Sequence, residues 1–189
     1  MAKSTRVTSA ALTLADLVVL SMLAERAQHG YELWAELERR EVARWASISK
    51  PQIYYSLKKL KQARHIESTA AGDSALGPDR QTFRPTPSGR RALADALARA
   101  EWATQDVPSP FVTWMVLSWQ ARPRDFAAQI VRRRKFLESQ LQFYRDALES
   151  IIAETSSTSD AAMIVRLAIR QSEVELAWLD EVASRHRPG

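Results

Sequence analysis

The chain contains no cysteine and only five glycines among its 189 residues. The lack of cysteine excludes disulfide bonds and thiolate metal sites, which suits a reducing compartment. The lack of glycine-rich runs excludes a phosphate-binding glycine loop. Strong helix formers such as Ala, Leu, Arg and Glu are abundant instead, so we predict a mainly α protein.

Long hydrophobic runs are also missing. The longest run near the start covers residues 17–24, which is too short to span a bilayer, and Asp16 and Glu25 flank it. It lacks the basic leader and the small-residue cleavage site of a signal peptide. These absences predict a buried helix at this position, a cytoplasmic protein and no membrane partner.

Patterns for catalysis and metal binding are absent as well. The three histidines, His29, His65 and His186, are scattered and have no carboxylates at metal-ligand spacing. No serine stands in a nucleophile-elbow sequence. We therefore expect no enzymatic activity, no metal and no cofactor.

The positive charge is concentrated in the first half of the chain. Residues 1–105 hold 16 Lys and Arg against 11 Asp and Glu, whereas residues 106–189 hold 11 of each kind. A local basic excess is typical of proteins that bind polyanions. The segment Val107-Pro108-Ser109-Pro110 marks a boundary, so we predict an N-terminal domain over residues 1–105 and a C-terminal domain over residues 106–189.

The order of elements in the first domain predicts a winged helix-turn-helix. Three helices are expected between residues 13 and 64, and two β-prone pieces at residues 66–69 and 81–85 follow around a turn-rich segment. These two pieces form a two-stranded β wing, and a fourth helix should continue to about residue 105. Three more helices are expected in an all-α C-terminal domain.

The third helix carries the pattern that points to function. Ile53, Leu57 and Leu60 recur at helical spacing and predict a core-facing stripe. On the opposite side, Gln can pair with adenine, and Lys can contact guanine or phosphate in the major groove. The predicted DNA-binding residues are Tyr31, Lys50, Gln52, Tyr54, Tyr55, Lys58, Lys59, Arg80 and Arg84. The alternative is the solvated face of an amphipathic helix.

The two wing arginines have two interpretations. In a winged fold, Arg80 and Arg84 lie against the phosphate backbone or the minor groove. Alternatively, these charges keep an edge hairpin soluble.

Several segments together resemble the PadR family of regulators. They are residues 12–23, His29-Gly30-Tyr31-Glu32-Leu33, residues 53–60 and residues 83–93, in this order. The resemblance implies a homodimeric winged-helix transcriptional regulator, usually a repressor, with a helical dimerisation region at the C-terminus. The long C-terminal part is similar to that of virulence-activator-like members. One departure is Arg64-His65, where the family often has glycine before the first wing strand.

Apolar stripes in the second domain predict a dimer. Spacings of four and three residues along one long helix are typical of a coiled-coil seam, and the last helix is apolar on more than one side. The predicted dimerisation residues are Leu137, Leu141, Tyr144, Leu148, Ile151, Leu167, Val174 and Trp178. The alternative is a helical bundle within one chain.

Two further clusters of similar residues stand out in the sequence. The aromatic cluster near the boundary predicts a pocket for a planar small effector, with packing between the two halves as the alternative; its residues are Trp102, Phe111, Trp114, Met115 and Trp119. The basic run at residues 132–135 fans out around a helix, so a solvated or salt-bridged face is expected there.

Together these features predict a sequence-specific DNA-binding transcriptional regulator. We expect a homodimer on a two-fold operator, acting as a repressor that a small effector releases. Two alternatives stay open, a small-ligand-binding helical protein and a protein-interaction module, each without a direct role at DNA.

Overall fold

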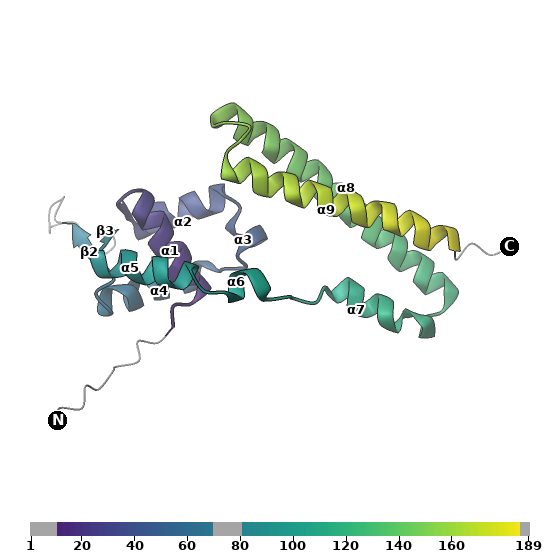
Figure 1. Ribbon diagram of the computed structural model, residues 1–189, viewed down its shortest axis with the longest axis horizontal. Helices are drawn as coiled ribbons and strands as arrows, with labels where there is room; N and C mark the ends of the chain where they lie inside the picture. Colours follow the sequence, from purple (N-terminus) through teal and green to yellow (C-terminus); the bar gives the residue numbers. More distant parts are fainter. Residues whose placement is uncertain (1–10, 70–80, 186–189) are drawn as a thin grey trace, which may run out of the picture. The chain divides into compact units, whose positions relative to one another are not determined.

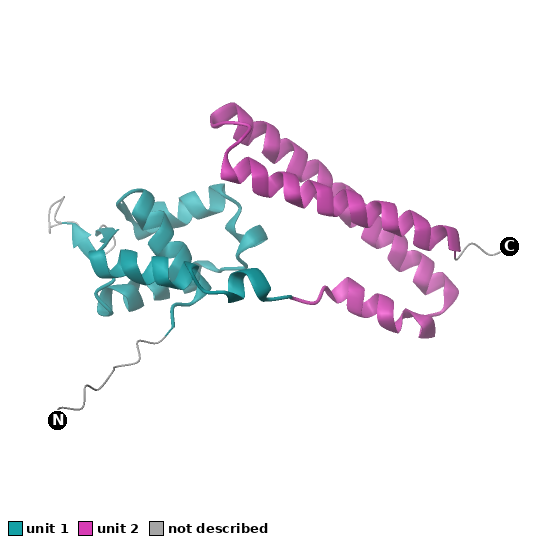
Figure 2. Cartoon of the chain, in the orientation of Figure 1, with its two compact units in different colours: residues 1–106 teal, residues 107–189 magenta. Residues whose placement is uncertain are grey.

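The computed structural model describes residues 11–69 and 81–185 (Figure 1). The chain divides into two compact units, residues 1–106 and residues 107–189 (Figure 2). Each unit has its own buried apolar cluster. The two units are therefore described separately.

Six helices lie in the described part of the first unit. They are α1 (Leu14–Glu25), α2 (Gly30–Arg39), α3 (Val42–Trp45), α4 (Lys50–Gln62), α5 (Pro87–Leu97) and α6 (Glu101–Thr104). Capping pairs in the sequence form local hydrogen bonds at the starts of α1 and α4. The Thr13 backbone N–H donates to Asp16 Oδ2 at 2.8 Å before α1, and the Ser49 backbone N–H donates to Gln52 Oε1 at 2.8 Å before α4.

A small antiparallel sheet accompanies these helices. Its strands are β1 (Gln28–His29), β2 (Ile66–Thr69) and β3 (Thr82–Pro85), in the order β1-β3-β2. Strands β2 and β3 form the predicted wing, with Ile66 opposite Pro85 and Thr69 opposite Thr82. Strand β1 was not predicted. It pairs with β3 because the backbone of buried Gln28 needs hydrogen-bond partners away from water.

The core of the first unit joins α1, α2 and α4. The predicted stripe of Ile53, Leu57 and Leu60 is buried against apolar residues of α1 and α2. The prediction of the inward face of this helix is therefore confirmed. The expected fourth helix is shorter than predicted, because α5 ends at Leu97 and the separate short helix α6 follows.

The second unit is helical throughout its described residues. It contains α7 (Pro110–Leu117), a 3₁₀ helix (Ser118–Gln120), α8 (Pro123–Glu154) and α9 (Asp160–Arg185). Helices α8 and α9 lie side by side and antiparallel, as a helical hairpin (Figure 1). Buried Ile130, Leu137, Leu179 and Val182 join them, and aromatic side chains of α7 pack against this cluster.

The architecture confirms the predicted fold class, mainly α with a winged N-terminal part and a helical C-terminal part. Within residues 11–69 and 81–185, no helix is long and apolar enough to cross a membrane. The same residues hold no group of three or more His, Asp or Glu side chains that would bind a metal ion.

Candidate nucleic-acid interface

Helix α4 exposes one polar face to solvent. Tyr55 is 69% exposed and Gln52 and Lys58 are exposed beside it, on the side opposite the buried stripe. We call Gln52, Tyr55 and Lys58 the reading face. It combines an amide, a hydroxyl and an ammonium group, which can donate hydrogen bonds to base edges and phosphates.

Tyr31, Lys50 and Tyr54 lie around this helix. Tyr31 is 69% exposed in the first turn of α2, and Tyr54 is 40% exposed. The start of α2 packs against α4, since a Cβ added to Gly30 would stand 3.1 Å from Leu57 Cδ1 and 3.3 Å from Tyr54 Cε1. This close approach places the start of α2 beside Tyr54. Lys50 is exposed at the beginning of α4.

Lys59 lies elsewhere than predicted. Its Nζ is 2.5 Å from Asp16 Oδ2, and the Asp16 carboxylate is fully buried. Burial raises the pKa of Asp16, but hydrogen bonds from Lys59 and Thr13 outweigh it and hold that pKa below its usual 3.8. The placement of Lys59 on the solvent-facing side was therefore wrong, because α1 covers this flank of α4.

The end of α4 is connected to the wing. Lys61 Nζ donates to Gln81 Oε1 at 2.7 Å and stands 5.5 Å from the centre of the Phe83 ring. On the wing itself, the Arg84 Nε donates to Glu67 Oε1 at 2.8 Å between exposed side chains. Arg84 thus remains at the surface, paired with its neighbour across the strands. Arg80 lies outside the described residues.

A tight junction joins α4, the wing and α5. Arg64 takes a left-handed backbone conformation with φ of 58°, at the position where glycine was expected. The hydroxyl groups of Thr86 and Ser88 donate to the Arg64 carbonyl oxygen at 2.8 and 3.1 Å. The Thr86 hydroxyl also accepts from the Gly89 backbone N–H and caps α5.

The predicted dimerisation residues separate into three groups by their exposure. Leu137 and Leu141 are buried inside the helical hairpin, so they pack within the chain. Tyr144, Leu148 and Ile151 are half-buried on the same helix. Leu167, Val174 and Trp178 on α9 are exposed. The coiled-coil spacing of α8 therefore reflects in large part its contact with α9.

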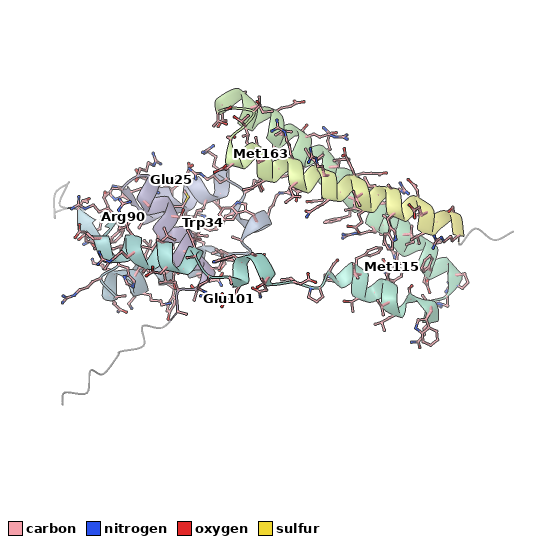
Figure 3. All side chains as sticks on the ribbon, viewed as in Figure 1. Glu25, Trp34, Arg90, Glu101, Met115 and Met163 are labelled. Carbon is pink, nitrogen blue, oxygen red and sulfur yellow. The ribbon has the colours of Figure 1, made fainter. Side chains whose placement is uncertain are left out.

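The five predicted effector residues are divided between the two units. Trp102 belongs to the first unit, where its indole N–H donates to the Ala96 carbonyl oxygen. Phe111 stacks on Trp114, with 5.5 Å between ring centroids, in the packing of α7 against the helical hairpin. Met115, labelled in Figure 3, and Trp119 line an apolar groove with a volume of about 580 Å³.

The basic run on α8 is salt-bridged, as expected. Arg133 donates two hydrogen bonds to Glu175 at 2.7 and 2.8 Å, and Arg134 pairs with Asp180. Both acidic partners lie on α9. These ion pairs join the two helices, and they leave this run without the exposed cluster of cations that a second nucleic-acid site needs.

Sequence reasoning missed Asp16 as a residue that bears on the site. One signal was present, since an acidic residue within a run of apolar positions on a buried helix needs a cationic partner. The partner itself is not visible in the sequence, because Lys59 is 43 residues away.

A three-helix core with a wing, followed by a helical hairpin, defines a winged helix-turn-helix protein with a helical C-terminal unit. Residues 19–95 match the model of the transcriptional regulator PadR-like family, and residues 110–187 match the model of the virulence activator alpha C-terminal family. The first unit therefore matches the PadR-like family of transcriptional regulators, and the second matches the C-terminal family of virulence activators.

Individual relatives agree with this placement. The chain is 26% identical over 184 residues to a "Probable transcriptional regulator" of Mycobacterium tuberculosis, covering 87% of this chain and 93% of the relative. The fold is similar to that of Bacillus subtilis PadR in complex with operator DNA, with a TM-score of 0.77, 17% identity, and coverage of 93% of this chain and 100% of the other.

Two further structures share the fold. Bacillus subtilis PadR in complex with p-coumaric acid gives a TM-score of 0.78 at 18% identity, over 92% of this chain and 99% of the other. The virulence activator AphA of Vibrio cholerae gives a TM-score of 0.66 at 20% identity, over 90% of this chain and 96% of the other.

Proposed function

We propose that this regulator binds double-stranded DNA sequence-specifically through the reading face on α4. The observation that carries the proposal is the exposure of Gln52, Tyr55 and Lys58 on a helix whose other side is buried. A helix with such a face fits the major groove. A protein of the same fold, Bacillus subtilis PadR, has been solved with operator DNA, which supports the proposal.

Residues around the reading face have supporting roles in this proposal. Lys50, Tyr31 and Tyr54 contact the phosphate backbone and set the position of α4, while Gln52 contacts a base edge. In the wing, Arg84 exchanges Glu67 for a phosphate when DNA is present, and Arg80 is proposed for the same contact. Exchange is easy because the Arg84–Glu67 pair is exposed and weak.

Selection of duplexes from a random-sequence pool, followed by titration at several salt concentrations, tests the proposal. Lys58→Gln should reduce the slope of log affinity against log salt by about one, since one phosphate contact is lost. Lys135→Gln, an exposed lysine of the second unit, is the matched control and should leave the slope unchanged. No enriched duplex even at low salt would favour a protein-interaction module instead.

The regulator is further proposed to act as a homodimer through an exposed stripe on α9. We call Ile164, Leu167, Val174 and Trp178 the α9 stripe. All four are exposed, and they recur at spacings of three, seven and four residues. Readers of two-fold sites are dimers, and an isologous contact of this stripe with its copy covers apolar surface that the chain leaves in water.

Light scattering after size-exclusion chromatography tests the dimer. The double substitution Leu167→Glu and Val174→Glu should produce a monomer, because four like charges would meet in the interface. Ser139→Glu, on the solvent-facing side of α8, adds charge to the same helical hairpin and should leave the dimer intact. A wild-type chain that is monomeric at micromolar concentration would contradict this part of the proposal.

The regulatory part of the proposal is repression that a planar aromatic effector relieves. The groove lined by Met115, Trp119 and Ile130 is the proposed site, and the p-coumaric acid complex of Bacillus subtilis PadR supports the ligand class. Aromatic carboxylic acids should quench tryptophan fluorescence and weaken DNA binding. Trp119→Phe should abolish the quenching, whereas Trp45→Phe, on α3 of the first unit, should not.

A further inference from the structure

We propose that Asp16 positions α4 by binding Lys59, and that this ion pair determines how strongly the regulator prefers its own site over other DNA. The inference rests on the proposed function of the reading face. Asp16 does not touch DNA in this proposal. It acts through Lys59 and is a positioning residue.

The geometry joins two helices through one oxygen atom. Asp16 Oδ2 accepts from Lys59 Nζ at 2.5 Å and from the Thr13 backbone N–H at 2.8 Å. The Asp16 side chain is fully buried, and the Lys59 side chain is 27% exposed. The first turn of α1 and the second half of α4 are thereby held at a defined separation.

The Asp16 carboxyl group is ionised at neutral pH, because its pKa lies below its ordinary value. Burial alone would favour a neutral carboxyl group, but Lys59 and Thr13 hold the pKa of Asp16 below its usual value. A buried carboxylate that loses its cation is left without compensation. The ammonium group of Lys59 is therefore held at α1 and is not available to a phosphate.

Rotation of α4 about its axis is the property that this pair controls. Ile53, Leu57 and Leu60 of α4 contact the core through apolar packing, which tolerates small shifts. A buried ion pair has one preferred register. Lys58 and Lys59 are adjacent, so the same rotation that brings Lys59 to Asp16 turns Lys58 and the rest of the reading face outward.

The test compares Asp16→Asn, Lys59→Met and the apolar double variant Asp16→Leu with Lys59→Met in the full chain. The probes are a duplex that the wild-type protein selects from a random pool and a scrambled duplex of equal composition. We expect each single variant to lower the preference for the selected duplex at least about tenfold, the loss of one well-placed base contact. Affinity for the scrambled duplex and its salt slope should change little.

Two outcomes would overturn the inference. If Lys59 contacted phosphate directly, Asp16→Asn would release it and tighten binding to the scrambled duplex, and Lys59→Met would lower the salt slope by about one. If the pair were merely structural, the melting temperature would fall and the preference would not. The apolar double variant separates these effects, because it restores packing without restoring the register.

A measurement without DNA keeps this inference separate from the proposed function. The chain has no cysteine, so spin labels attached at Ser21→Cys and Lys58→Cys report the distance between α1 and α4 alone. Asp16→Asn should broaden this distance distribution, while a control pair at Ser21→Cys and Glu38→Cys, on α1 and α2, should keep its width. Should the wild-type protein select no duplex, the proposed function fails. An unchanged α1–α4 distribution would overturn the positioning role itself.

Discussion

Gly89, in the first turn of α5, lies directly against the backbone of His65: a Cβ added to Gly89 would stand 2.0 Å from the His65 carbonyl oxygen. That oxygen also accepts from the Thr86 backbone N–H at 2.9 Å. The backbone of the wing entry and the start of α5 therefore meet without room for a side chain. Glycine is needed here for space.

Gly89→Ala should destabilise the first unit by about 2 kcal/mol or more, because a backbone oxygen cannot move aside as a side chain can. Gly30→Ala is the matched control. Its added Cβ meets only the side chains of Leu57 and Tyr54, at 3.1 and 3.3 Å, and the stability should change by less than about 1 kcal/mol. Urea unfolding followed by circular dichroism measures both. Equal effects of the two variants would contradict the close approach at His65.

Acid should weaken the first unit through Glu36. Hydrogen bonds from Arg39, and then from Arg40, outweigh the cost of burial and lower the pKa of Glu36 from 4.5 to about 2. A group whose pKa falls on folding stabilises the protein fully above its unfolded pKa, and this contribution is lost as the pH falls toward the folded value. The stabilisation by Glu36 should therefore disappear between about pH 4.5 and pH 2.

Glu36→Gln tests this dependence directly. The variant should be less stable than the wild-type protein near neutral pH, and the difference should shrink as the pH falls toward the pKa of Glu36, about 2. Glu38→Gln is the control, since within the described residues the Glu38 carboxylate forms no ion pair. A difference between wild type and Glu36→Gln that stays constant from neutral to acid pH would show that the ion pairs are not responsible.

The buried face of α4 was predictable from the sequence. The surroundings of the residues at the edge of that face were not. The spacing of Ile53, Leu57 and Leu60 identifies the buried side because any neighbouring element covers an apolar stripe. Lys59 stands at the edge of that stripe. Whether such a residue meets water or a buried acid depends on the position of α1, which a helical wheel does not contain.

The sequence also could not show which helix packs against a coiled-coil stripe. Leu137 and Leu141 have the spacing of a dimer seam, yet they pack against α9 of the same chain. Heptad spacing shows that a helix has a helical neighbour and does not show which chain supplies it. Strand β1 was missed for a different reason, because two residues are too few to show a period.

Arg133 should contribute more to the second unit than its neighbours in the basic run. Its guanidinium group binds Glu175 with two hydrogen bonds and stands 5.0 Å from the centre of the Phe111 ring. Arg133→Ala should therefore lower stability by about 2 kcal/mol, typical of hydrogen bonds between charged groups. Arg132→Ala, at an exposed position, should change it by less than about 0.5 kcal/mol. Unfolding in guanidinium chloride measures both variants. Similar losses of stability would show that the contacts of Arg133 with Glu175 and Phe111 are not responsible.

Arg64 offers the opposite kind of substitution, one that should stabilise. Its φ of 58° is held by hydrogen bonds to its carbonyl oxygen from Thr86 and Ser88, so the backbone keeps this conformation whatever the side chain. The left-handed region costs a residue with a Cβ about 1–2 kcal/mol, whereas glycine loses about 0.5–1 kcal/mol more backbone entropy on folding. Arg64→Gly should therefore raise stability by up to about 1 kcal/mol. Arg64→Ala controls for the lost charge and should give no gain, and Arg64→Val should destabilise because a β-branched side chain is strained there. If alanine stabilised as much as glycine, relief of charge and not of the backbone would be the cause.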